Sequence, residues 1–384
     1  MTTAELNQLL DKIFTIPVEI RTQTFQNNSP YPALNNLEND GFSFTGKELL
    51  HAIGSKIAAL PSSSRDESIR AAYLYAHLLD FDGSYLGYKT TVNIDSDLQT
   101  NRSNEIGIGM GCLIANKLFG VNWDTLEPIK GTGKRFDYRA TNPGQNYAYE
   151  FKGSKHRGKQ NSQIENGLEK KADMHARNER YDVELIISSL LDVSTREPRI
   201  VLADPPFNGY RDEFTEQAQL FYRLRHYSRI AQFVGNVALS RTLYKQAQLL
   251  IPPQAERISP DQIDELGFRT YSREIALREN QEHMGVLETI KLQNQGYIGR
   301  WINDWIPPIN FNVRHTYSLP PIDEASNLEI FQGVTTDVYT ALTSIETEKI
   351  KGLLKEKRQD LIGPNDGQYS SFEDGTIMSY RLSV

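Results

Sequence analysis

Two acidic residues and one lysine in the middle of the chain have the types and the spacing of a hydrolytic metal site. Asp137 lies in one run of alternating residues, Glu150 and Lys152 lie in the next, and the segment 142–145 separates the two runs. Paired carboxylates suit Mg²⁺, which keeps several waters and can polarise a phosphodiester and acidify a bound water. A neighbouring lysine can hold the nucleophile or stabilise the developing charge. The three residues therefore predict metal-dependent hydrolysis, with Mg²⁺ as the cofactor and Mn²⁺ as its substitute.

The segment 142–145 sets the register in which the two runs pair. Its central residues are Pro143 and Gly144, which are typical of a turn between two strands. If the pairing is symmetric about this turn, Asp137 lies opposite Glu150, whereas a shift of one residue would separate them. Opposed like charges are destabilising, so the pair predicts either a raised carboxyl pKa or a bound divalent cation, and we favour the cation.

Alternation divides the expected hairpin into two faces. The charged face carries Arg135, Asp137, Arg139, Ala148, Glu150 and Lys152. The aromatic face carries Phe136, Tyr138, Tyr147, Tyr149 and Phe151. We expect the aromatic face to pack in the core and the charged face to bear the chemistry.

The charge around the hairpin differs from that of the whole chain. The 384 residues carry a formal net charge of −7, which argues against indiscriminate coating of nucleic acid. Between positions 130 and 171, however, ten Lys and Arg residues stand against four Asp and Glu residues, a local charge of +6. This local excess favours a phosphate-bearing substrate near the hairpin.

The elements that would position the hairpin follow from periodicity and from turn residues. Ser103 is expected to cap a helix that ends at Gly120. Strands are expected at 125–129, 135–141, 147–153, 183–190 and 199–203, with a helix at 161–178 between the third and fourth strands. The predicted fold class is therefore α/β, an α+β arrangement with a mixed sheet and the order α-β-β-β-α-β-β.

The flanking regions are predicted to be mostly helical. Residues 1–95 contain helical patterns at 46–60 and 65–79, and residues 211–384 begin with a long periodic stretch at 213–250. The expected division is an N-terminal region at 1–95, a core at 96–210 and a C-terminal region at 211–384. The last region would serve substrate recognition or oligomerisation, such as a homodimer.

The residues and the element order resemble the PD-(D/E)xK nuclease superfamily, the fold of many restriction endonucleases. The resemblance covers about 103–206, with Asp137 as the first acid and Glu150-Phe151-Lys152 as the ExK element. Phe136 stands where the family usually has a proline, so the opening of the motif is absent. The resemblance implies a restriction endonuclease-like αβββαβ core and an endonuclease that cuts DNA, expected to be double-stranded, in restriction or antiphage defence.

The resemblance also implies roles for single residues. The metal ligands would be Asp137, Glu150 and the carbonyl of Phe151, with Glu105 on the preceding helix as an additional catalytic acid. Gln163 and Lys170, on the helix after the ExK strand, would lie near the substrate. The basic Lys155 and Arg157 belong to the same substrate-binding group through the local positive charge.

Other interpretations stay open at this point. The hairpin could be a solvated surface feature with mutually paired charges, or the fold could bind nucleic acid or a partner without cutting. Asp204-Pro205-Pro206-Phe207 matches a tetrapeptide of amino-directed DNA methyltransferases. Against a methyltransferase, no Gly-rich loop follows a strand, and the glycines at 107–111 fall inside an expected helix, where they would permit close packing.

Three further features bear on function or location. The segment 222–229 interleaves aromatic and basic residues and could clamp a nucleic-acid backbone, or could form one helix with a wet and a dry side. His156 and His175 are interpreted as surface residues without a partner. The first eight residues show no signal-peptide pattern, no long apolar stretch follows, and Cys112 is the only cysteine, so we expect a cytoplasmic protein without a membrane segment.

Overall fold

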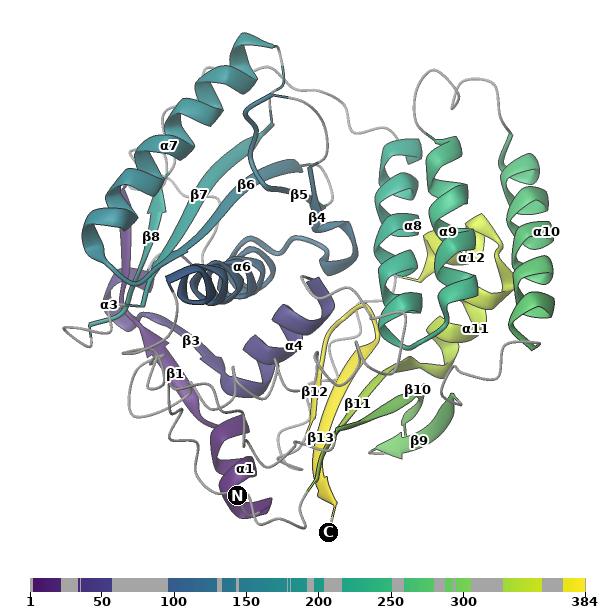
Figure 1. Ribbon diagram of the computed structural model, residues 1–384. Helices are drawn as coiled ribbons and strands as arrows, with labels where there is room; N and C mark the ends of the chain where they lie inside the picture. Colours follow the sequence, from purple (N-terminus) through teal and green to yellow (C-terminus); the bar gives the residue numbers. More distant parts are fainter. Residues whose placement is uncertain are drawn as a thin grey trace.

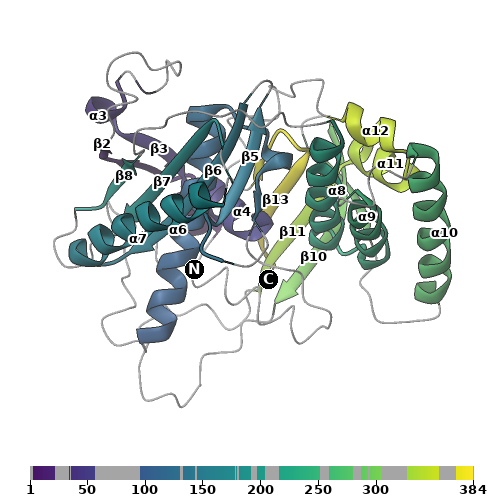
Figure 2. The same cartoon turned by 90° about the horizontal axis from the view of Figure 1, so that it is seen from above.

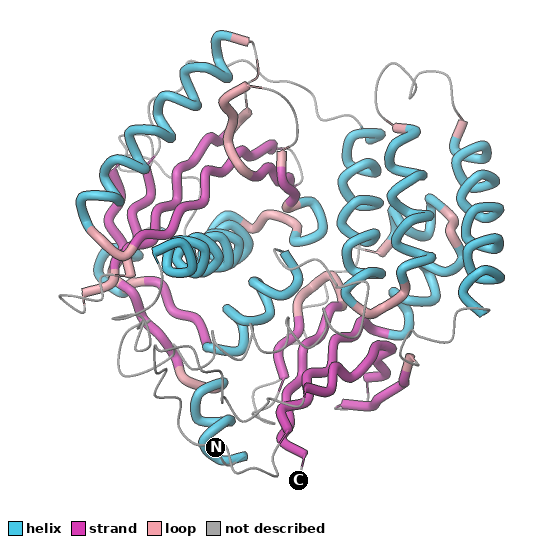
Figure 3. The backbone as a smooth tube through the Cα atoms, viewed as in Figure 1, coloured by secondary structure: helices cyan, strands magenta, loops and turns pink. Residues whose placement is uncertain are grey.

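The protein has a mixed α/β fold, seen in a computed structural model (Figure 1). The structure describes residues 3–21, 34, 36–56, 96–129, 133–142, 145–177, 179, 181–191, 197–203, 216–250, 259–279, 287–292, 295–304, 327–353 and 369–383. Two larger sheets and one two-stranded sheet lie within these ranges. Figure 3 shows the strands gathered in two groups, with helices around both.

The hairpin lies within a six-stranded mixed sheet. Its strand order is β2-β8-β7-β6-β5-β4, in which β2 with β8 and β6 with β7 are parallel pairs. The strands are β2 (Val18–Arg21), β4 (Glu127–Pro128), β5 (Tyr138–Asn142), β6 (Gln145–Ser154), β7 (Val183–Leu190) and β8 (Arg199–Ala203). Helices α6 (Ser96–Phe119) and α7 (Arg157–Ala176) pack on opposite faces (Figure 1). Both β7 and β8 have the predicted bounds.

The register of the hairpin is the one that the turn predicts. Strands β5 and β6 are antiparallel, with Asn142 opposite Gln145 and Tyr138 opposite Tyr149. This pairing is symmetric about positions 143 and 144. The first strand is shorter than predicted, because β5 begins at Tyr138 and Asp137 lies immediately before it.

The two faces of the hairpin are both packed. Tyr138, Tyr147, Tyr149 and Phe151 belong to the main core with α6, as predicted. The assignment of Phe136 to that face is wrong, because it packs on the α7 side. Alternation stops at Tyr138, where the strand begins, so residues before it need not follow the pattern. The face of the sheet that α7 covers carries the charged residues and also a second hydrophobic core. This core consists of Phe136, Ala148, Ile164, Met174, Ile186, Val201 and Ala203.

Helix α6 approaches the sheet more closely than side chains would allow. The helix begins at Ser96, so the prediction that Ser103 caps it is wrong. Ser103 lies inside the helix, where its hydroxyl donates to the Thr100 carbonyl. A Cβ atom on Gly107 would lie 2.3 Å from the Gly153 nitrogen, and one on Gly153 would lie 1.7 Å from the Ser103 carbonyl oxygen. The expectation that the glycines permit close packing is confirmed.

In the described part of the N-terminal region, strands accompany the helices, and one of them belongs to the main sheet. Strand β2 pairs with β8 and so belongs to the main sheet, while β1 (Ile13–Ile16) pairs with β3 (Phe42–Thr45). The helices are α1 (Thr3–Leu10), α3 (Leu37–Asp40) and α4 (Gly46–Lys56), of which α4 packs against α6. The helical pattern at 65–79 lies outside the described residues.

The C-terminal region contains a sheet that the sequence did not predict. Its strands, in the order β12-β13-β11-β10-β9, are β12 (Tyr369–Ser371), β13 (Thr376–Ser383), β11 (Asn327–Thr335), β10 (Gln295–Asp304) and β9 (Glu288–Leu292). Its helices are α8 (Glu216–Phe233), α9 (Val237–Leu249), α10 (Pro260–Glu279), α11 (Thr336–Ser344) and α12 (Thr347–Gly352). Figure 2 shows α8, α9 and α10 on the side of the molecule away from α7.

The long periodic stretch at 213–250 is two helices rather than one. Gly235, between α8 and α9, has a φ of +91°, which glycine adopts without strain and which ends a right-handed helix. Asn236 then caps α9, because its side-chain oxygen accepts from the Leu239 N–H at 3.0 Å. None of the helices in the described ranges has both the length and the apolar character needed to cross a membrane.

A buried histidine connects α4 to the C-terminal region and should make the fold sensitive to acid. His51 packs against Phe372 with ring centroids 4.3 Å apart, and burial lowers its pKa to about 3. In the unfolded chain, His51 becomes protonated below its ordinary pKa of about 6.5, whereas in the folded chain it stays neutral down to about pH 3. The free energy of unfolding therefore decreases as the pH falls from 6.5 towards 3.

We expect His51→Phe to remove this part of the acid sensitivity. The wild type should lose about 2 kcal/mol of unfolding free energy between about pH 7.5 and pH 5 through His51, since one proton is worth about 1.4 kcal/mol per pH unit. The phenylalanine ring keeps the stacking but does not titrate. Urea unfolding at both pH values measures the difference. An equal loss in the variant and the wild type would contradict the assignment.

Candidate functional site

Four charged side chains meet where β5, β6 and α7 come together. The Lys152 ammonium lies 2.5 Å from Asp137 Oδ2 and 2.8 Å from Glu150 Oε1. The Lys170 ammonium, from α7, lies 2.6 Å from the same Glu150 oxygen and 3.3 Å from Asp137 Oδ1. The structure therefore brings the predicted Asp137, Glu150 and Lys152 together and adds Lys170 as a direct member of this four-charge cluster.

The cluster lies partly inside the protein. The Glu150 side chain is 0% exposed, whereas that of Asp137 is 31% exposed, so the cluster opens to solvent on the Asp137 side. Burial raises the pKa of Glu150, the charge of Asp137 raises it further, and Lys152 offsets part of the rise. These features do not fit a hairpin whose charges are all solvated.

Lys152 is held in its charged form. Burial alone lowers the pKa of an ammonium, but the carboxylates of Glu150 and Asp137 outweigh burial and raise the pKa of Lys152 above its ordinary value. A lysine with a raised pKa donates hydrogen bonds and positive charge at neutral pH. It does not serve as a general base there.

The Asp137–Glu150 pair can supply ligands for one small cation. Glu150 Oε2 is buried without a hydrogen-bond partner, although its sister oxygen contacts two ammonium groups. Among the described residues, no group of three or more His, Cys, Asp or Glu side chains is placed to hold a metal ion. Two carboxylates fit Mg²⁺, which typically retains waters and needs few protein ligands. Phe151, the third proposed ligand, lies in β6 beyond the last residue that pairs with β5.

Strand β4 fixes the backbone of Asp137. The Ile129 N–H donates to the Asp137 carbonyl at 2.9 Å, and Glu127 in β4 lies opposite Arg139 in β5. The carboxylate of Asp137 therefore depends on the short β4 strand for its position, although the residue itself lies outside β5.

Helix α7 places the expected substrate-binding residues at one end of β6. The Gln163 amide donates to the Gly153 carbonyl at 3.1 Å, one residue beyond Lys152. Lys155 is half-buried and Arg157 is exposed at the start of α7. Burial and the neighbouring Lys159 lower the pKa of Lys155. These residues lie beside the ExK strand, as predicted.

Glu105 is not brought to the four-charge cluster. It lies on α6, which packs on the face of the sheet opposite α7. Ser103 and Gly107 face β6, and a residue midway between them points about 180° away from that side, given 3.6 residues per helical turn. The half-buried Glu105 therefore has no place in the cluster, and the expected fourth acid is replaced by a second lysine.

A second ion-pair group on α7 was missed. Glu184 of β7 is buried, and its Oε2 lies 2.6 Å from His175 Nε2 and 3.2 Å from the Lys171 ammonium. His175 therefore has a carboxylate partner, contrary to the interpretation as an unpartnered surface residue. His156 is exposed, as expected. The group connects α7 to β7 about two to three turns beyond Gln163.

The aromatic and basic segment 222–229 faces inward. It belongs to α8, where Tyr222 is buried and the Arg139 guanidinium lies 3.8 Å from the centre of its ring. Arg223 donates to Asp124 Oδ2 at 3.0 Å, and Arg229 lies 2.6 Å from Glu127 Oε1. The segment forms a joint with the β4 side of the main sheet, in which Arg223 and Arg229 pair with carboxylates of the protein itself.

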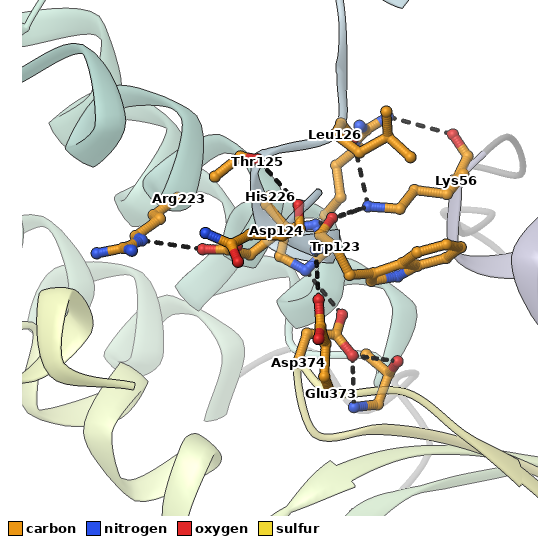
Figure 4. Close-up of polar contacts among 12 residues, drawn as sticks. Lys56, Trp123, Asp124, Thr125, Leu126, Arg223, His226, Glu373 and Asp374 are labelled. Carbon is orange, nitrogen blue, oxygen red and sulfur yellow. Dashed lines mark hydrogen bonds and ion pairs between the residues drawn. The ribbon is translucent and has the colours of Figure 1, made fainter. Parts of the chain in front are cut away.

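The centre of this joint is a buried imidazole (Figure 4). His226 Nε2 lies 2.8 Å from Asp374 Oδ2, and the Lys56 ammonium lies 3.2 Å from His226 Nδ1 and 2.5 Å from the Trp123 carbonyl. The joint thus connects α4, η3 (Trp123–Thr125), α8 and the β12–β13 turn.

Charges in the joint compensate one another. Burial lowers the pKa of Lys56 to about 8. Although burial opposes them, Arg229 and His226 lower the pKa of Glu127 to about 2, and His226 does the same for Asp374. The only sequence signal for this joint was the clustering of bases on α8, because its acidic partners are distributed over distant segments.

The tetrapeptide 204–207 that matches amino-directed methyltransferases lies outside the described residues. Comparison of the chain with models of known families, with curated proteins and with solved structures found no match. The case for a function rests on the four-charge cluster itself.

Proposed function

We propose that the chain is a metal-dependent nuclease that hydrolyses phosphodiester bonds at the four-charge cluster. The observation that carries the proposal is the apposition of Asp137 and Glu150 beside Lys152, with Glu150 fully buried and one of its oxygens without a partner. An oxygen buried without a partner is costly, and both ammonium groups contact Oε1, so Oε2 is the oxygen that a metal ion could use. The resemblance to the PD-(D/E)xK nucleases and their core supports the same assignment.

The carboxylates of Asp137 and Glu150 and the carbonyl of Phe151 would hold Mg²⁺. Bound there, the ion would polarise a phosphodiester and acidify a water. Lys152 would stabilise the negative charge that develops on the phosphate, because it stays protonated next to both carboxylates. Lys155 and Arg157 would bind backbone phosphates and position the substrate without reading its sequence.

The local positive charge supports a nucleic-acid substrate, and the resemblance supports double-stranded DNA. Exposed basic residues at the start of α7 lie at the end of the strand that carries Lys152. A role in restriction or antiphage defence is proposed from the resemblance, and a cytoplasmic location from the sequence features described above.

Purified protein should cleave plasmid DNA in the presence of Mg²⁺ or Mn²⁺ and should be inactive in EDTA. Gel electrophoresis of plasmid DNA, single-stranded DNA and RNA with each metal measures both the substrate class and the metal dependence. Retention of DNA in a mobility-shift assay without any cleavage would favour the alternative, a nuclease-fold protein that binds and does not cut. Cleavage that continues unchanged in EDTA would contradict the metal-dependent mechanism.

A further inference from the structure

We propose that Lys170 is a displaceable counter-ion, whose ammonium holds the place that a divalent cation needs and leaves it when the cation binds. This inference rests on the proposed metal-dependent function and adds a regulatory step to it. The four contacts that Lys152 and Lys170 make with Asp137 and Glu150 carry the argument.

The charges of the cluster balance without a metal. Two carboxylates face two ammonium groups, all within 3.3 Å. Adding a divalent cation to this set would leave two uncompensated positive charges beside a fully buried glutamate, and like charges at such distances repel strongly. One ammonium must therefore move away for a cation to bind between the carboxylates.

The pattern of contacts identifies Lys170 as the one that moves. Glu150 offers a cation its free Oε2, so no displacement is needed on that side. Both Asp137 oxygens are occupied, Oδ2 by Lys152 at 2.5 Å and Oδ1 by Lys170 at 3.3 Å. The longer contact is the weaker one, so the cation gains its Asp137 ligand by replacing Lys170 at Oδ1.

The two lysines also differ in their attachment. Lys152 lies on the same strand as Glu150, two residues away, and is fixed by that strand. Lys170 reaches the cluster from a separate element, α7, while the exposed fraction of both side chains is the same, 24%. Once displaced, its ammonium is free for a substrate phosphate, whose negative charge offsets one of the two excess positive charges. Metal and substrate are then expected to bind cooperatively.

Lys170→Met should raise the affinity for Mn²⁺ in the absence of nucleic acid. Removing a competing positive charge at this distance should lower the Kd by about tenfold or more, using an effective dielectric constant of about 20. Isothermal titration of the full chain with Mn²⁺ measures this directly. Lys170→Gln is a second neutral variant, for use if the methionine variant does not fold by circular dichroism.

Two control variants separate competition from other effects. Lys170→Arg keeps the charge and should not tighten Mn²⁺ binding. Lys159→Met removes an exposed lysine from the same helix, outside the four-charge cluster, and should leave the Kd unchanged. Wild-type protein with ¹³C-methylated lysines provides a further measurement, in which Mg²⁺ should shift the Lys170 resonance more than that of Lys152.

The outcomes distinguish the counter-ion from the proposed function. If the wild type binds Mn²⁺ and both neutral variants bind it no more tightly, the displacement is wrong and the nuclease proposal stands. If neither the wild type nor any folded variant binds Mn²⁺, the metal site and the displacement are both wrong. If the neutral variants bind Mn²⁺ and the wild type does so weakly, displacement is supported whether or not nucleic acid is cut.

Discussion

Lys152→Ala should reduce the rate of DNA cleavage by about a hundredfold to a thousandfold, since removal of one donor to a developing oxyanion costs this much in other hydrolases. Lys152 contacts both carboxylates and is kept charged by them. No other residue on β6 can supply that charge. Single-turnover cleavage of plasmid DNA with saturating Mg²⁺ measures the loss in the chemical step.

Two comparisons make this result specific to chemistry. Lys349→Ala removes an exposed lysine of α12, which belongs neither to the four-charge cluster nor to the basic start of α7, and should cleave like the wild type. Lys152→Arg keeps the positive charge but replaces a compact ammonium with a larger, planar guanidinium, so only partial cleavage activity is expected. Circular dichroism should show all three variants folded. Equal cleavage by the wild type and Lys152→Ala on every substrate would contradict the proposal that Lys152 is a catalytic residue.

Gly153→Ala should prevent the protein from folding stably, the largest effect we expect on stability. Its Cβ would lie 1.7 Å from the Ser103 carbonyl oxygen, a backbone atom that no side-chain rotation can move away. Helix α6 would have to move away from β6, and this movement would open the aromatic core that lies between them. The cost should be about 3 kcal/mol or more, at the upper end for an overpacked core.

Gly158→Ala is the matched control for this prediction. Gly158 lies in α7, and a Cβ there would meet nothing within 4 Å. Alanine has the higher helix propensity by about 1 kcal/mol, so this variant should be as stable as the wild type or more so. Thermal melts of both variants, together with their yield of soluble protein, decide the matter. A Gly153→Ala protein that melts within a few degrees of the wild type would contradict the close packing.

The sequence was sufficient for those parts of the core that depend on local rules. The turn predicted from Pro143 and Gly144 led to the hairpin register that β5 and β6 have, and short runs rich in Val, Ile and Leu led to the bounds of β7 and β8. Alternation failed at Phe136 because it has meaning only inside a strand, and β5 begins two residues later. The start of α6 failed because Ser103, a good cap by type, lies against a glycine of the sheet instead.

Contacts between residues far apart in the sequence explain the other differences between the predicted and the observed structure. The C-terminal sheet contains β10 and β11, which carry glycines such as Gly299 and Gly333 that weaken a strand signal. Those strands are stabilised by pairing with each other and with β13 rather than by their own propensity. Lys170 reaches the four-charge cluster because α7 folds over β6. Helical periodicity indicates on which side of a helix Lys170 lies, but not which strand that side contacts.

The joint centred on His226 determines how this molecule can be divided. A fragment that ends at β8 would retain Lys56, Asp124 and Glu127 but would lose Arg223, Arg229, His226 and Asp374. Its retained charges would lose their partners next to an exposed apolar surface, so expression of the half that carries the four-charge cluster should give an insoluble product. Recombination between related genes that exchanges one half should be selected against for the same reason, and the two halves are expected to be inherited as one unit.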